Sequence, residues 1–136
     1  MKYTHHQLEY EIDDSWLIEA GVFGFKPRRD HYRVQPKADV FVIRFESVEP
    51  LTERARLRGI FCDDQNSGAS AKERVVRILQ WLRDDCQVEP VRVVRSKLAE
   101  YEYKLVEGCH RFHCAQAMGF KSIPAVLGFD MSDPYA

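Results

Sequence analysis

The chain of 136 residues is long enough for one hydrophobic core and too short for two ordinary domains. Hydrophobic residues make up 45% of it and charged residues 30%, which excludes the disordered and membrane-spanning classes. The formal net charge of −1 also excludes a generally basic nucleic-acid binder. We therefore expect a single compact domain with one dominant site.

The N-terminal residues and the cysteines indicate the compartment. Charged and amphipathic sequence follows Met1, without the apolar block of a secretory signal, so we expect a cytoplasmic protein with no membrane partner. The cysteines form no paired CxxC units, which favours reduced thiols over a disulfide framework. They are Cys62, Cys86, Cys109 and Cys114.

The first half of the chain contains few regular elements. A short helix is predicted over residues 15–20, with capping oxygens from Asp13 and Asp14 before it and Gly21 after it. Residues 40–45 are rich in β-branched and aromatic types and predict a strand. Residues 63–68 are polar and predict an exposed loop.

The second half alternates strands and helices. Ser70 is the expected N-cap of a helix that ends near residue 84, and its apolar residues recur at helical spacing. Strands are predicted over residues 91–94 and 101–106, paired as a hairpin, and over 122–127. A further helix runs from residue 109 or 110 to 118. Pro124 predicts that the last strand is an edge strand or that it starts there.

The most informative stretch is residues 107–111, Glu-Gly-Cys-His-Arg, here called turn 107–111. A strand that passes through Gly108 directly into a helix directs the first helical N–H groups and the positive end of the helix dipole into the turn. Such a terminus binds phosphate, and Arg111 adds a side chain that makes bidentate contacts to phosphate oxygens. The turn is therefore a candidate anion site.

A structural explanation of the same residues is also open. Arg111 shares a helical stripe with Ala115 and Met118, so it faces the core and needs a partner, which a structural carboxylate could provide. His110 would then be merely exposed, because the turn lacks the fuller spacing of a P-loop. Trp16 and Trp81 are interpreted as core or half-buried aromatics rather than as stacking platforms for a ligand.

A metal site is a weak alternative for the helix after the turn. Cys109 with His113, and His110 with Cys114, are spaced by four residues and could supply ligands on one helical face. No second ligand pair follows at a recognisable spacing, so we expect no protein-bound metal among these residues.

Residues 103–124 read Tyr-Lys-Leu-Val-Glu-Gly-Cys-His-Arg-Phe-His-Cys-Ala-Gln-Ala-Met-Gly-Phe-Lys-Ser-Ile-Pro. This run resembles the signature segment of the ParB/sulfiredoxin superfamily. In that segment a strand leads to an acidic or small residue, which is followed by Gly, a variable residue, His or Arg, and then Arg. A helix that contains Ala comes next, and the segment closes with a Gly and Ile-Pro. Residues 89–93 resemble the family's Pro-initiated strand, and residues 71–82 the helix before it. The resemblance covers residues 40–128, leaving 1–39 as an extension of unknown role and 129–136 as a tail.

The resemblance implies a small α/β (α+β) fold with a mixed sheet, in which turn 107–111 holds nucleotide phosphates. Members include partition proteins that bind CTP, sulfiredoxins that use ATP, a serine kinase that uses ADP and proteins described as nucleases. Carried over by position, phosphate would contact Gly108, His110, Arg111 and, from the preceding helix, Lys72. Glu107 takes the acidic position that organises a metal or an attacking group. We expect ATP or a related nucleotide with Mg²⁺ and phosphoryl transfer or hydrolysis.

The motif leaves two alternatives open. Glu-Gly-Cys-His-Arg differs at one position from the sulfiredoxin motif Gly-Gly-Cys-His-Arg, so Cys109 could serve an ATP-dependent cysteine sulfinate reductase, because a helix N-terminus lowers a thiol pKa. The acidic Glu107 opposes both thiolate and phosphate unless a cation intervenes.

The other alternative is a nucleotide-operated binding module. Basic residues near Arg28 and Arg56 would then contact DNA or a protein partner. The chain lacks a recognisable helix-turn-helix, which disfavours sequence-specific partitioning, and its oligomeric state is not predicted.

Overall fold

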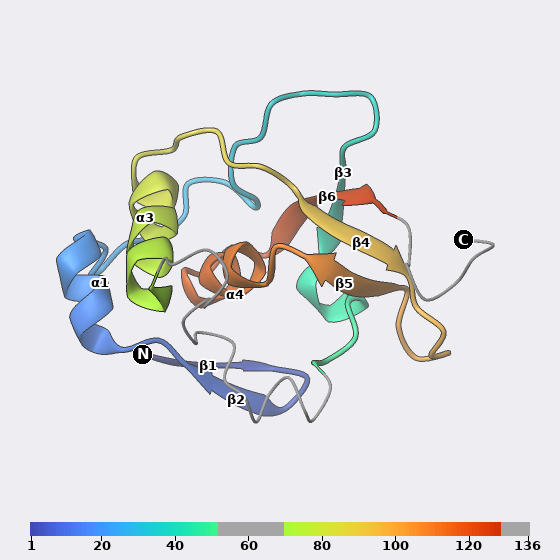
Figure 1. The fold of residues 1–136 in the computed structure, drawn as a ribbon, viewed down its shortest axis with the longest axis horizontal. Helices are drawn as coiled ribbons and strands as arrows, with labels where there is room; N and C mark the ends of the chain where they lie inside the picture. The colour runs from blue at the N-terminus through green and yellow to red at the C-terminus, as the bar shows by residue number, and fades with distance from the viewer. Residues whose placement is uncertain (52–69, 129–136) are drawn as a thin grey trace.

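The computed structural model describes residues 1–51 and 70–128. In this part of the chain it contains three α-helices and two sheets, which confirms the predicted mixed α/β class (Figure 1). The strands are β1 (Lys2–His5), β2 (Leu8–Glu11), β3 (Phe41–Arg44), β4 (Val91–Arg95), β5 (Tyr103–Glu107) and β6 (Ser122–Leu127). The helices are α1 (Asp14–Ala20), α3 (Ala71–Arg83) and α4 (Cys109–Ala117), and a 3-10 turn, η1 (Phe45–Ser47), follows β3.

The sequence predicts no element for residues 1–11, yet the structure forms an antiparallel hairpin of β1 and β2 there. Its two-residue turn, His6 and Gln7, has positive φ angles of 51° and 69° without glycine. Two imidazoles attach the hairpin to η1 and to the residue after it: His5 Nε2 lies 3.0 Å from the Phe45 carbonyl oxygen, and His6 Nε2 lies 2.8 Å from that of Val48. These long-range contacts stabilise a turn that is unfavourable by itself.

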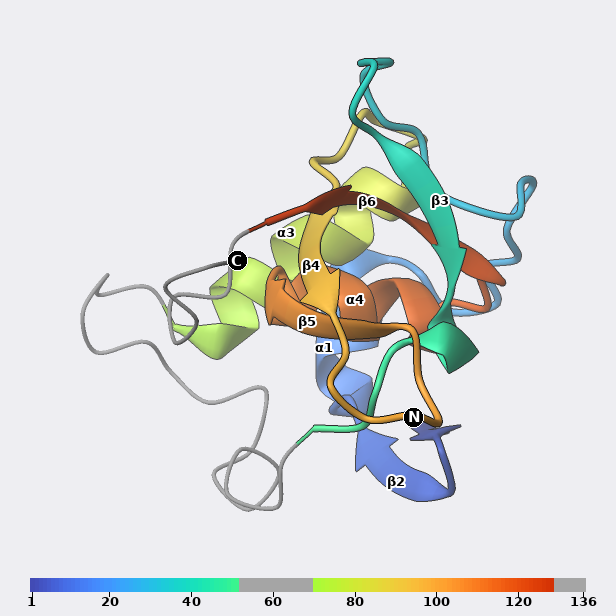
Figure 2. The same cartoon turned by 90° about the vertical axis from the view of Figure 1, so that its right-hand side faces the viewer.

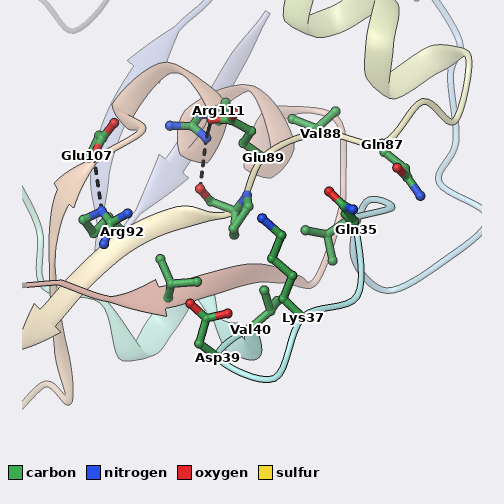
Figure 3. Close-up of a pocket in the computed structure, with 13 residues that line it drawn as sticks. Gln35, Lys37, Asp39, Val40, Gln87, Val88, Glu89, Arg92, Glu107 and Arg111 are labelled. Atoms are coloured by element: carbon green, nitrogen blue, oxygen red, sulfur yellow. Dashed lines mark hydrogen bonds and ion pairs between the residues drawn. The ribbon is translucent and has the colours of Figure 1, made fainter.

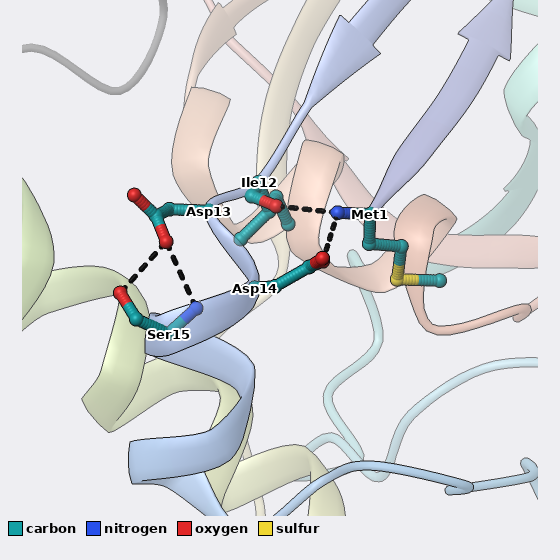
Figure 4. A network of polar contacts seen from close by, with 5 residues as sticks. All are labelled: Met1, Ile12, Asp13, Asp14 and Ser15. Atoms are coloured by element: carbon teal, nitrogen blue, oxygen red, sulfur yellow. Dashed lines mark hydrogen bonds and ion pairs between the residues drawn. The ribbon is translucent and has the colours of Figure 1, made fainter.

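Helix α1 begins as its capping residues predict. Asp13 accepts hydrogen bonds from the backbone N–H of Ser15 at 2.8 Å and from its hydroxyl at 2.7 Å (Figure 4). The amino group of Met1 donates to the Ile12 carbonyl at 2.8 Å and contacts the carboxylate of Asp14. The start of the hairpin and the start of α1 are thereby held together.

The main sheet has the strand order β3-β6-β4-β5, and the helices lie together on one face of it (Figure 2). The predicted β4–β5 hairpin is confirmed, whereas β4 and β6 are parallel. The prediction from Pro124 is wrong, because β6 is an inner strand and Pro124 is its third residue. Proline is tolerated at this position because the pairing of β6 with β4 begins only at Ala125. The missing N–H of Pro124 therefore removes no hydrogen bond to β4.

A register shift interrupts the β4–β5 ladder immediately before turn 107–111. Arg92 pairs with Glu107 and Val93 pairs with Leu105, so Val106 is an extra residue on β5. Such a bulge changes the direction of the side chains beyond it. It places Glu107 opposite the exposed Arg92, although simple alternation would put Glu107 on the same face as Leu105.

Helix α3 is capped as predicted, because the Ser70 hydroxyl accepts a hydrogen bond from the Glu73 N–H at 3.1 Å. It packs between α1 and α4, burying one apolar stripe (Figure 1). The buried residues are Ala71, Val75, Ile78, Leu79 and Leu82. The opposite side of the helix is therefore available to form a site.

Buried residues from both halves of the chain form one hydrophobic core. Ile12, Leu17 and Tyr32 belong to it together with residues of α3, α4 and the main sheet, among them Leu79 and Phe112. Residues 1–39 thus pack against the later elements, while the predicted division of the chain at residue 39 stays a prediction. No helix in the described part is long and apolar enough to cross a membrane.

Candidate functional site

Turn 107–111 joins β5 to α4 through Gly108, which adopts a φ of 94°. A Cβ atom at this position would lie 2.9 Å from Val91 Cγ1 and 3.0 Å from Arg111 Nη2. Both the backbone angle and the close approach therefore require glycine. Gly108 is the N-cap residue of α4 and has no side chain, so it offers no capping oxygen to the first N–H groups at the positive end of the helix dipole.

Arg111 faces inward as the helical stripe predicts, and its side chain is 17% exposed. Its guanidinium donates to the Pro90 carbonyl oxygen at 2.9 Å. The neighbouring carboxylate of Glu89 lies 3.7 Å away and is 90% exposed, so solvent weakens this pair. The guanidinium has five donors, and a backbone carbonyl with a screened carboxylate leaves it able to bind an anion.

A pocket of about 830 Å³ opens beside this turn, a size typical of small-molecule sites. We call it the turn pocket. Its residues come from α3, from the segment before β4 and from turn 107–111. They are Arg74, Arg77, Ile78, Trp81, Gln87, Val88, Glu89, Glu107, Gly108, Cys109, His110 and Arg111. Five of the six residues predicted for the site therefore border one pocket.

The sixth predicted residue, Lys72, is not among those lining the turn pocket. Its ammonium pairs with the Glu19 carboxylate of α1 at 2.8 Å, which raises the Lys72 pKa. Arg74 and Arg77 contribute the positive charge of α3 instead. They repeat at i and i+3 on the side of the buried stripe that includes Ile78. Lys72 faces elsewhere, because two residues along a helix change the direction of the side chain by about 200°.

A second pocket of about 390 Å³ adjoins the first. We call it the loop pocket, because the segment before β3 forms its far wall (Figure 3). Lys37 extends toward its centre and Asp39 lies at its lower edge in this view. Five residues, Gln87, Val88, Glu89, Glu107 and Arg111, line both pockets. A ligand in the turn pocket and a ligand in the loop pocket would thus lie on opposite sides of the Glu89 and Glu107 carboxylates and the Arg111 guanidinium.

Glu107 lies at this shared wall. Its carboxylate is 3.4 Å from Arg92 Nε, so a cation already offsets the charge that opposes phosphate binding. Among the described residues, no group of three or more His, Cys, Asp or Glu side chains could hold a metal ion. Glu107 and Glu89 are the two carboxylates that line the turn pocket.

The remaining thiols and imidazoles of α4 differ in burial. Cys109 and His110 are half-buried and line the turn pocket. Burial, followed by the nearby Cys109, raises the pKa of the Cys114 thiol. Burial lowers the pKa of His113 to about 3, with smaller effects of His5 and His110. Among the described residues, the spaced Cys and His pairs belong to no metal-binding group.

Two of the basic residues near Arg28, Arg29 and Arg33, are paired with the loop after α3. Arg29 lies 3.1 Å from the Asp85 carboxylate, and Arg33 donates to the Asp85 carbonyl at 3.3 Å. The predicted loop at residues 63–68 lies outside the described residues. The same holds for Cys62 and the cluster that includes Arg56. A DNA or protein partner therefore stays a prediction.

Neither the protein-family models nor the curated proteins include a match to this chain. Among solved structures, the crystal structure of sulfiredoxin from Arabidopsis thaliana is similar to it, with 20% sequence identity and a TM-score of 0.46. The match covers 70% of this chain and 88% of that chain. A likeness of this degree identifies no activity, so the function has to be inferred from the residues of the pockets.

Proposed function

We propose that the protein binds ATP or a related nucleotide in the turn pocket and transfers or hydrolyses its terminal phosphoryl group. The observation that carries this proposal is the convergence of Arg74, Arg77 and Arg111 with the first turn of α4 on one pocket. A triphosphate is the ligand that matches several guanidinium groups and a helix N-terminus at once. The uncharged Gly108 permits close approach of the phosphates.

Glu107 is proposed to act on the attacking group. The oxygen of water or of an acceptor hydroxyl forms a bond to the terminal phosphorus while the bond to the nucleoside diphosphate breaks. Glu107 accepts the proton of the attacking oxygen, and the loop pocket on its other side offers space for an acceptor. Mg²⁺ held by the phosphates with Glu107 or Glu89 would neutralise charge on the transferred group.

Isothermal titration with the Mg²⁺ complexes of ATP, ADP, CTP and GTP tests the binding. Arg111→Ala should lower the affinity for the preferred nucleotide roughly 10- to 100-fold, as expected for loss of hydrogen bonds to a charged group. Arg95→Ala is the matched control, because Arg95 is exposed on β4 and lines neither pocket. Failure of the wild type to bind any of the four nucleotides would contradict the proposal.

Measurement of nucleotide turnover distinguishes an enzyme from a binding module that only holds the nucleotide. Release of phosphate, or transfer to an acceptor, that disappears in Glu107→Gln supports the enzyme. Tight binding without turnover supports a nucleotide-operated switch, and a DNA or protein partner would then have to be sought through the basic N-terminal region.

The position of Cys109 favours a second candidate, an ATP-dependent cysteine sulfinate reductase. Its half-buried thiol lines the turn pocket beside the proposed phosphate site. Incubation with a hyperoxidised peroxiredoxin, ATP, Mg²⁺ and a thiol reductant should then restore the peroxiredoxin thiol. The wild type should repair the sulfinate and Cys109→Ser should not. No repair by the wild type would eliminate this candidate.

A further inference from the structure

The α3 wall of the turn pocket has two chemically different ends. Arg74 lies toward the N-terminal end of the helix and Trp81 toward its C-terminal end, with Arg77 and Ile78 near the middle. Their spacings of three, four and seven residues place all four on one side of α3. Arg74 and Trp81 are separated by about 10 Å along the helix axis, given a rise of 1.5 Å per residue.

Trp81 is not needed to anchor α3. The buried stripe that includes Val75, Leu79 and Leu82 fixes the helix, while Trp81 is 40% exposed. Within the described part of the chain, no aromatic ring stacks on its indole. A large apolar side chain that faces a pocket rather than the core is a common sign of ligand contact.

The surroundings of Trp81 suit a flat apolar group. Ile78 precedes Trp81 by three residues on the same side of α3. Val88 and Gln87, which follow the helix, also line the turn pocket, and the carboxamide of Gln87 can both donate and accept hydrogen bonds. Toward the N-terminal end of α3 the wall carries the arginines. A ligand that fits both ends has an aromatic ring at one end and negative charge at the other.

We infer that Trp81 is the platform on which the base of the bound nucleotide stacks. This inference rests on the proposed nucleotide binding and adds an orientation to it. The base lies on the ring of Trp81, and the phosphates lie toward Arg74, Arg77 and turn 107–111. Stacking depends on ring area more than on the edge of the base, so purine nucleotides should bind more tightly than pyrimidine nucleotides.

Two ligands that share phosphates but differ in the base test this assignment. Titration of ATP and of inorganic tripolyphosphate, both with Mg²⁺, is compared for the wild type, Trp81→Leu and Trp81→Phe. Trp81→Leu should weaken ATP roughly 10- to 100-fold, the usual effect of removing one base-stacking ring. Tripolyphosphate affinity should be unchanged, and Trp81→Phe should retain most of the ATP affinity. Thermal unfolding of each variant shows that the fold is intact.

Tryptophan fluorescence gives a second readout. ATP should quench the emission of the wild type, and the quenching should be lost in Trp81→Leu, where Trp16 is the remaining tryptophan. Tripolyphosphate should not quench either protein.

The possible failures are distinguishable. Equal ATP affinity in the wild type and Trp81→Leu overturns the stacking platform and leaves nucleotide binding intact. An equal loss for ATP and tripolyphosphate also overturns it, because Trp81 would then act through the shape of the pocket. Absence of any binding by the wild type overturns both the platform and the proposed function.

Discussion

The first two turns of α4 carry the same pair of reactive residue types in opposite environments. Cys109 and His110 are half-buried and border the turn pocket. His113 and Cys114 are buried among aromatic rings of the N-terminal hairpin and the core. Residue type alone therefore does not locate reactivity on this helix, because exposure and the dipole at the helix start differ between adjacent turns.

Side chains further along α4 fix the position of its first helical turn. Phe112 packs edge-on against Phe45 at 5.1 Å and against His5 at 5.4 Å, measured between ring centroids. His113 lies 4.8 Å from Tyr10 by the same measure. These contacts fix the helix to η1 and to the hairpin, so the turn that faces the pocket starts from a rigid base.

The largest expected effect is on stability, from truncation in the second turn. Phe112→Ala should lower the free energy of unfolding by about 3–5 kcal/mol, because it leaves a cavity in the core. His110→Ala, two residues earlier, should lower it by about 1 kcal/mol, a typical effect of a single substitution. Urea denaturation measures both. Equal losses would show that the two turns do not differ in their contribution to the core.

A smaller effect is expected at the turn itself. Gly108→Ala forces a side chain into the left-handed region, which costs about 1–3 kcal/mol, and it also meets Val91 and Arg111. Gly24→Ala is the matched control, because Gly24 has a φ of 77° and nothing lies within 4 Å of its added Cβ. Thermal unfolding should show the larger loss for Gly108→Ala. A loss no greater than that of Gly24→Ala would mean that the close approach is unimportant.

The pH dependence of stability tests the environment of His113, which faces Tyr3, Tyr10 and His5. Its pKa is about 3 in the fold and 6.5 ordinarily, so the unfolded chain binds the proton first as pH falls. Stability from neutral His113 is present above pH 6.5 and is lost as pH falls toward 3, by at most about 1.4 kcal/mol per pH unit.

Urea titrations between pH 7 and pH 4 measure this loss. His113→Phe should reduce the slope measured for the wild type. Burial also lowers the pKa of His5, so part of the slope should persist in His113→Phe. A wild-type slope retained in full by His113→Phe would contradict the assignment.

The smallest effect concerns reactivity without a change in stability. In a chain with Cys62→Ser and Cys86→Ser, iodoacetamide should modify Cys109 in the folded protein and Cys114 only after unfolding, because Cys114 is fully buried and its pKa is raised. Mass spectrometry of peptides identifies the modified thiol. Rapid modification of Cys114 in the folded state would show that the second turn opens.

Most regular elements could be predicted from local patterns, because caps and apolar periodicity act within a few residues. Ser70 and Gly21 are examples, and the structure confirms both as helix ends. The β1–β2 hairpin could not be predicted, since its turn at His6 and Gln7 depends on contacts with residues about 40 positions away. Local sequence carries no trace of such contacts.

The site residues likewise divide into those that a local pattern predicts and those that depend on contacts between distant parts of the chain. Turn 107–111 is contiguous, so its residues could be selected together. Arg74, Arg77 and Trp81 reach the pocket only through the packing of α3 against α4, which the sequence does not specify. Lys72 differs from Arg74 by two positions, and that offset determines whether a cation faces α1 or the pocket.

The bulge at Val106 has a consequence for comparing this chain with others. Because one residue of β5 is outside the regular ladder, we expect a chain that lacks it to keep Glu107 opposite Arg92 and Gly108 beside Val91. The strand can therefore change length by one residue while the turn stays in place. A sequence alignment of such turns should allow a gap inside the strand rather than shift the glycine.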